Sequence, residues 1–303
     1  LSPRIARARG MKVLPVVRRL AGDKSAIVRR ECAIALRNEL GPDAAKTWAK
    51  LALAHDGTDR WYLEALGIGA ARQWDLCFAA WFEKTRDVWN LPSGRDIVWR
   101  SRSRFTPGLL ADLTLNADSA TESYARYVRA FQFQPDNDAR RDGLLKVFDS
   151  PNLEYTFAAA TDLTYEDLAT DALRIGRIRS LIREFRGKPE LVRLVDALDI
   201  RTADEELLEF ALSRPDQPEA LRATQLLMED TSIVNRVLRG DVQQAMEFIR
   251  LMGRAGDSRA NAELLKLLQR DSASISLRGA AADALALNRL GASKLFDLAK
   301  AGR

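Results

Sequence analysis

All six tryptophans of this 303-residue chain fall in its first third, where adjacent residues of opposite charge accompany them. The tryptophans are Trp48, Trp61, Trp74, Trp81, Trp89 and Trp99. The charge pairs are Asp59–Arg60 and Arg95–Asp96. Buried indoles usually pack in cores with the ring N–H bonded, so we expect them between helix pairs, with semi-buried ion pairs beside them.

The alternative is that the same region forms a surface for a ligand or a partner's loop, since Trp is enriched at interfaces. Its residues would be Arg60, Trp61, Arg95, Trp99, Arg100 and Arg102. Arg104 would extend this patch if the side chains are exposed. This set is the candidate interaction surface of the chain.

Residues that commonly support catalysis or metal binding are sparse. His55 is the only histidine, and we expect it in a loop or at a helix end beside Asp56. Cys32 and Cys77 have neither CxxC nor metal-site spacing and lie in apolar stretches, which is typical of small buried hydrophobes. We therefore predict that the chain is not an enzyme, with no catalytic, cofactor-binding or metal-binding residues and no cofactor.

Features that would indicate nucleic acid or phosphate are weak. The formal net charge is +5, a small excess over many charges of both signs. Arg179, Arg183 and Arg186 form a basic helical stripe, but acidic residues follow between positions 196 and 209, which favours a solvated face with ion pairs between helices. Gly67 and Gly69 lie in a helical pattern with no preceding strand and indicate close helix packing. We do not expect nucleic acid as a partner.

The elements that position these residues are helices. Two apolar stripes at i, i+4, i+7 and i+8 share one frame: Val28, Cys32, Ala35 and Leu36, and Leu277, Ala281, Ala284 and Leu285. Each follows a first helix, expected near residues 13–20 and 260–268, as in the HEAT pattern of paired helices. Because one pair cannot bury its stripe alone, successive pairs must stack. We predict an all-α fold, an α-solenoid of HEAT-like (ARM-type) helix pairs.

Capping signals continue between the two ends of the chain. Three capping boxes are expected, at Ser119 with Glu122, Thr202 with Glu205 and Thr164 with Asp167. An apolar stripe from Leu168 to Ile182 predicts continuing helix. We expect residues 1–303 to form a single solenoid, with a soft bend near residues 151–164.

We expect no targeting segment within this sequence. No apolar run reaches the length that spans a bilayer, so no transmembrane segment is expected. The chain has no signal peptide and begins with Leu1 rather than Met, from which we expect a segment of a larger protein.

Five stretches resemble one known family. They are DRWYLEALGIGA (59–70), WD (74–75), AAW (79–81), GRDIVWRSR (94–102) and RYVRAF (126–131). Together they look like the HEAT-repeat region of the large bacterial dehydrogenase-like haem proteins common in planctomycetes and verrucomicrobia. In that family a sugar-dehydrogenase-like β-propeller precedes the helical region and a c-type cytochrome with CxxCH follows it. This chain has no CxxCH and no propeller-like strand repeats.

The resemblance implies a scaffold that connects a dehydrogenase-like propeller to a c-type cytochrome, the two partner domains, in the periplasm. Two other functions stay open. One is a HEAT-fold DNA glycosylase with a basic concave face, and the other is a free-standing adaptor for protein partners.

Overall fold

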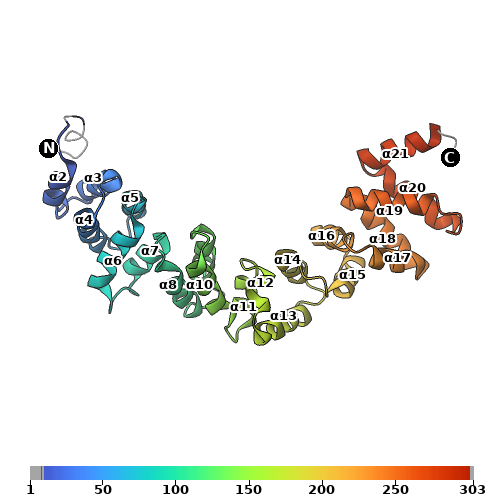
Figure 1. The fold of residues 1–303 in the computed structure, drawn as a ribbon, viewed down its shortest axis with the longest axis horizontal. Helices are drawn as coiled ribbons and strands as arrows, with labels where there is room; N and C mark the ends of the chain where they lie inside the picture. The colour runs from blue at the N-terminus through green and yellow to red at the C-terminus, as the bar shows by residue number, and fades with distance from the viewer. Residues whose placement is uncertain (1–7, 9, 301–303) are drawn as a thin grey trace. The chain divides into compact units, whose positions relative to one another are not determined.

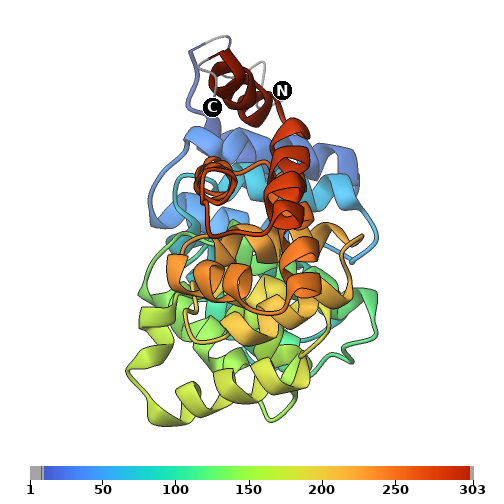
Figure 2. The ribbon, with the colours of Figure 1, turned by 90° about the vertical axis from the view of Figure 1, so that its right-hand side faces the viewer.

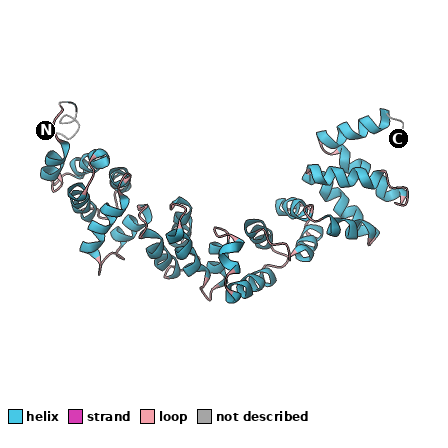
Figure 3. Ribbon diagram, in the orientation of Figure 1, coloured by secondary structure: helices cyan, strands magenta, loops and turns pink. Residues whose placement is uncertain are grey.

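The computed structural model describes residue 8 and residues 10–300. Throughout these residues the secondary structure consists of helices and turns, with no strand (Figure 3). Successive helices pack against one another, so the predicted all-α, solenoid-like fold is confirmed. The chain divides between Leu163 and Thr164 into two units.

Unit 1 contains helices that alternate between two layers. Its helices are α2 (Val13–Leu20), α3 (Ala26–Ala35), η1 (Leu36–Asn38), α4 (Pro42–Leu53), α5 (Arg60–Ala70), α6 (Trp74–Thr85), α7 (Pro92–Arg100), α8 (Thr106–Leu115), α9 (Glu122–Ala130), η2 (Phe131–Phe133), α10 (Asp138–Phe148) and α11 (Leu153–Ala160) (Figure 1). Helices α3, α5, α7 and α9 pack in succession in one layer. In the other layer α4 packs on α2 and α6, and α8 packs on α10.

Unit 2 repeats the same kind of packing. Its helices are α12 (Tyr165–Ala169), α13 (Ala172–Glu184), α14 (Pro189–Leu198), α15 (Asp204–Ser213), α16 (Pro218–Leu227), α17 (Thr231–Arg239), α18 (Val242–Ala255), α19 (Ser258–Leu268), α20 (Ile275–Ala286) and α21 (Arg289–Lys300). Helices α14, α16, α18 and α20 pack in succession, and α15, α17 and α19 pack on α16, α18 and α20 respectively. The last of these helices, coloured orange to red, face the viewer in Figure 2.

Apolar stripes and indole hydrogen bonds hold the layers together. The predicted stripe of α20 is buried along its whole length, from Leu277 to Leu285. In unit 1 the Trp48 Nε1–H donates to the carbonyl of Leu66 at 2.8 Å, and the Tyr62 hydroxyl donates to the carbonyl of Leu51 at 2.8 Å. These bonds tie α4 to α5 and satisfy polar atoms that burial would otherwise leave unpaired.

Ion pairs between neighbouring helices cover the surface of unit 2. Arg222 of α16 binds both carboxylate oxygens of Asp196 on α14, at 3.0 and 2.5 Å. Arg186 binds Glu209 of α15, so the basic stripe around Arg186 is partly compensated by the acidic residues that follow it. Ion pairs this exposed contribute little to stability, because water screens the charges.

Glycines occur where helix backbones approach most closely. A Cβ on Gly69 of α5 would lie 2.3 Å from the carbonyl oxygen of Ala33 on α3. A Cβ on Gly253 of α18 would lie 2.6 Å from the carbonyl oxygen of Ala284 on α20. Real Cβ atoms do not approach other atoms this closely. A side chain at either position would therefore push apart two helices of the same layer.

No helix in residues 10–300 combines the length and the apolarity that crossing a membrane requires.

The crossing of α18 and α20 can be tested by two matched substitutions. Gly253→Ala should lower the free energy of unfolding by about 1–3 kcal/mol, because the new methyl group overpacks the crossing. Gly279→Ala, in α20 with nothing within 4 Å of the new Cβ, should raise it by about 0.5–1 kcal/mol through helix propensity. Urea unfolding followed by circular dichroism measures both. Equal effects of the two substitutions would contradict the close approach.

Candidate interaction site

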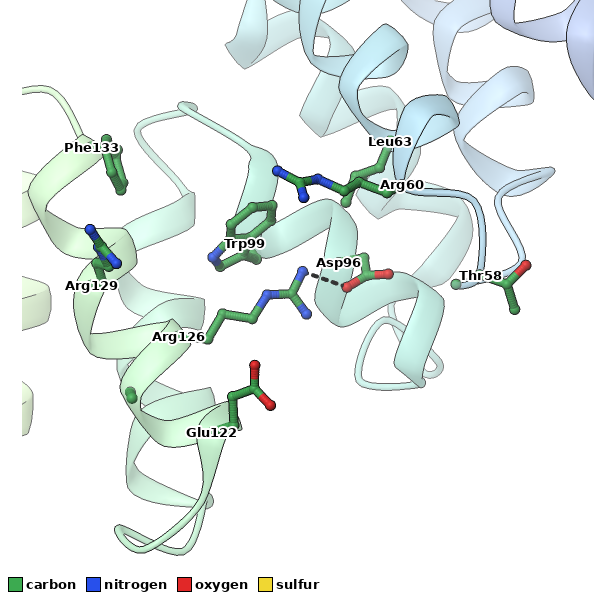
Figure 4. Close-up of a pocket in the computed structure, with 11 residues that line it drawn as sticks. Thr58, Arg60, Leu63, Asp96, Trp99, Glu122, Arg126, Arg129 and Phe133 are labelled. Carbon is green, nitrogen blue, oxygen red and sulfur yellow. Dashed lines mark hydrogen bonds and ion pairs between the residues drawn. The ribbon is translucent and has the colours of Figure 1, made fainter.

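A pocket of about 720 Å³ lies across α5, α7 and α9 in unit 1 (Figure 4). Its lining residues are Gly57, Thr58, Arg60, Leu63, Asp96, Trp99, Glu122, Ala125, Arg126, Arg129 and Phe133. They come from the loop before α5, from three successive helices of one layer and from η2. The packing of that layer therefore sets the shape of the pocket.

Asp96 is the central charge of this pocket. Its Oδ1 accepts a hydrogen bond from Arg126 Nη2 at 2.7 Å, and its Oδ2 lies 3.1 Å from His55 Nε2. The Asp96 side chain is only 14% exposed. Arg126 is also held over the ring of Trp99, with its guanidinium carbon 4.2 Å from the ring centroid. The carboxylate thus links α7 to α9 and to the loop after α4.

Two opposing effects determine the pKa of Asp96. Burial raises it, whereas the hydrogen bond with His55 and the hydrogen bond and charge of Arg126 lower it. The bonds prevail, so the pKa of Asp96 lies below its ordinary value. The ionised carboxylate is therefore the form that the folded unit stabilises.

His55 is the buried partner of the second Asp96 carboxylate oxygen. Its side chain is 1% exposed, and its ring stacks on Tyr62 with the centroids 6.0 Å apart. Its Nδ1 is buried without a hydrogen-bond partner among the described residues. We assign the ring proton to Nε2, because this tautomer donates to Asp96 and leaves a lone pair, rather than an N–H group, unpaired.

Arg60 and Arg129 are the uncompensated cations of the pocket. Both are exposed, and neither forms an ion pair within the part of the chain that the structure describes. Arg60 begins α5, and Arg129 lies in the last turn of α9. Figure 4 shows them on different walls of the pocket, with Trp99 drawn between them. These two side chains are free to bind an external anion.

The structure divides the residues that the sequence analysis proposed as an interaction surface. Arg60 and Trp99 line the pocket just described. Arg100 and Arg102 line a second pocket of about 410 Å³, with Trp74 on its wall.

The other two proposed residues line neither of these pockets. Trp61 is 69% exposed at the start of α5. Arg95 is exposed, and its Nε donates to the backbone carbonyl and the side chain of Asn90 at 2.7 and 2.9 Å. The proposed set is therefore spread over the surface rather than gathered at one site.

Arg100 and Arg102 already have intramolecular partners. Arg102 donates to the carbonyls of Trp99, Arg100 and Ser101 at 3.1, 3.0 and 2.6 Å, and so caps the C-terminus of α7. Burial lowers its pKa to about 10. Arg100 binds Glu64 at 3.0 Å and lies where a Cβ on Gly67 would be, so that glycine makes room for a guanidinium.

Of the two adjacent charge pairs, Arg95–Asp96 contributes a residue to the expected ion network between helices. Asp59 does not pair with Arg60; its carboxylate accepts the N–H of Tyr62 at 3.0 Å and caps α5. Asp96 joins a semi-buried ion network between helices, as expected, but its partner is Arg126 rather than Arg95. The reason is geometric, since neighbours in a helix point in different directions.

The residues of α9 that line the pocket were not among those predicted from the sequence. Glu122, Arg126, Arg129 and Phe133 recur at i, i+4, i+7 and i+11, one face of α9 that continues into η2. A polar stripe that ends in an aromatic residue was a usable signal. His55 lies in the loop after α4, as expected, but its burial against a carboxylate 41 residues away was not readable from the sequence.

The two thiols lie outside this pocket. Cys32 and Cys77 are fully buried, as predicted for small hydrophobes. Burial raises the pKa of Cys32 to about 11 and that of Cys77 to about 12. Within the described residues, no group of three or more His, Cys, Asp or Glu side chains is placed to hold a metal ion.

Comparison with protein-family models gives no match, and comparison with curated proteins gives none either. The resemblance to the helical region of the dehydrogenase-like haem proteins therefore stays a prediction. What the pocket can bind follows from its charges and its shape.

The Asp96 network predicts a pH-dependent contribution to stability. Because the pKa of Asp96 is lowered on folding, its contribution is present at neutral pH and is lost as the pH falls through the folded-state pKa. Asp96→Asn should lower the free energy of unfolding by about 1–3 kcal/mol at pH 7, and the difference from wild type should shrink in acid.

Urea unfolding at a series of pH values, followed by tryptophan fluorescence, measures this difference. Asp136→Asn is the control, because the Asp136 side chain is 99% exposed. A difference between Asp96→Asn and wild type that stays constant down to acid pH would contradict the network.

The raised thiol pKa values predict unreactive cysteines. At pH 8 the folded protein should react with a disulfide reagent such as DTNB only on the timescale of unfolding, because neither thiol ionises or meets solvent. In urea both should react within minutes. Rapid reaction of one equivalent in the folded protein would show that Cys32 or Cys77 is accessible.

Proposed function

We propose that this chain is a non-catalytic interaction scaffold that binds a protein partner at the face formed by α5, α7 and α9. One observation carries the proposal. Arg60 and Arg129, two exposed arginines with no ion-pair partner among the residues that the structure describes, lie beside Trp99 and Phe133 in one open pocket. Arginine and aromatic side chains are the residue types that contribute most to protein interfaces.

Pre-organisation supports a binding role for this face. Trp99 is held by Arg126, and Arg126 by Asp96, so the centre of the pocket is fixed before any partner arrives. The other lining side chains are carried almost entirely by stacked helices rather than by long loops. Binding to such a surface loses less conformational entropy than binding to a mobile one.

The specific form of the proposal is a connector in a larger redox protein. The resemblance of residues 59–70 and 94–102 to the helical region of the dehydrogenase-like haem proteins supports it. In this form the partners are a dehydrogenase-like propeller and a c-type cytochrome of the same polypeptide, in the periplasm. Electron transfer falls steeply with distance, so a domain that holds the two partners together would affect its rate.

The proposal is tested with the polypeptides encoded on either side of this region in its gene. Each is produced separately, and its binding to this chain is measured by calorimetry. We expect binding by at least one of them. The double substitution Arg60→Glu with Arg129→Glu should weaken it about tenfold or more, because each new carboxylate repels the anionic group of the partner that the arginine would bind.

Arg95→Glu is the matched control, since Arg95 is exposed on α7 but lines neither pocket. A loss as large with the control would contradict the assigned face. The absence of a CxxCH-bearing domain beside this region would contradict the connector form. Tight, salt-dependent binding of duplex DNA in place of protein would contradict the scaffold itself.

A further inference from the structure

The charges of the pocket are uneven along α9. Arg126 is neutralised by Asp96, whose second oxygen is held by His55. Arg60 and Arg129 have no counter-charge within residues 10–300, whereas Glu122 lies on α9 two turns before Arg129, roughly 10 Å along the helix axis. In Figure 4 Glu122 lies below Arg126, apart from Arg60, Arg129 and Phe133. The uncompensated positive charge of the pocket is therefore located at Arg60 and Arg129, where a ligand's negative charge would bind.

Apolar surface lies beside these two cations. Phe133 is 53% exposed, Trp99 is half-buried, and Leu63 contributes a buried aliphatic wall. Arg102 approaches the Phe133 ring at 5.6 Å, which fixes that ring beside the pocket. A ligand that fits must therefore combine carboxylate-like charge with an apolar group, rather than charge alone.

The shape of the pocket favours a polypeptide segment over a small molecule. Gly57, Thr58, Ala125 and Arg129 are exposed although they line it, so the pocket is shallow and open. Small-molecule sites bury most of their ligand's surface, which an open pocket of this kind does not achieve. An extended chain can instead lie across α5, α7 and α9 and use several shallow contacts.

The exposed carboxylate of Glu122 disfavours nucleic acid. A strand with evenly spaced phosphates would have to pass Glu122, and like charges repel there. A peptide can carry negative charge only at the positions that face Arg60 and Arg129. We propose that the pocket receives an extended acidic–aromatic segment of the partner protein, in which two carboxylates bind Arg60 and Arg129 and an aromatic side chain between them packs on Trp99 and Phe133.

This inference rests on the proposed scaffold function, and it names the chemistry of the partner at the same site. The probe is a fluorescein-labelled peptide with a central Glu-Ala-Phe-Ala-Glu, in which the two Glu side chains and the Phe face the same side of an extended chain, and fluorescence anisotropy measures its binding. It should bind at least about tenfold more tightly than the matched Gln-Ala-Phe-Ala-Gln peptide, because each carboxylate gains a charge-assisted hydrogen bond. Replacing Phe by Ala should also weaken it, and raised salt should reduce the difference between the acidic and amide peptides.

Substitutions in the chain locate the peptide. Arg60→Gln and Arg129→Gln should each weaken binding about tenfold, and Arg95→Gln should leave it unchanged. Glu122→Gln should strengthen binding several-fold, because it removes a repulsive charge from the pocket. A gain of affinity cannot result from misfolding, so this variant separates recognition from stability.

Equal affinity for the acidic and amide peptides, or no effect of Arg60→Gln and Arg129→Gln, would overturn the inference. So would tighter binding of an oligothymidylate of similar length. In these cases the scaffold function would still be supported if a polypeptide encoded on either side of this region binds the chain. Conversely, selective binding of the acidic peptide, with no binding by the polypeptide encoded on either side, would support the pocket and contradict the connector.

Discussion

Close approach of neighbouring helices in one layer is the constraint on which both units depend. Short amphipathic helices bury enough apolar surface only when each lies against the next, and small residues at the crossings permit this. At Gly69 and at Gly253 the neighbouring backbone occupies the space that a side chain would need. The same requirement brings α5, α7 and α9 side by side, and the pocket exists because their exposed side chains meet there.

The helices were largely predictable because their information is local. Apolar spacing located α3 and α20, and the capping box at Thr164 with Asp167 is present as predicted. The boxes at Ser119 and at Thr202 are wrong. Asp118 forms a turn that moves the cap of α9 to Thr121, and α15 begins after Ala203.

Local competition also explains why the predicted stripe from Leu168 to Ile182 is not one helix. The Asp171 carboxylate accepts the N–H of Leu173 at 2.8 Å and starts α13 anew after α12 ends at Ala169. The site was less predictable, because its central bonds join Asp96 to residues 30 and 41 positions away. Nothing in the vicinity of His55 or Arg126 in the sequence identifies Asp96 as their partner.

The lining of the pocket lies wholly between residues 57 and 133, on successive helices of one layer in a single unit. Because the whole lining lies in the first unit, the pocket can assemble while later repeats are still being synthesised. Helix pairs of the second unit can be altered without changing any residue that lines this pocket.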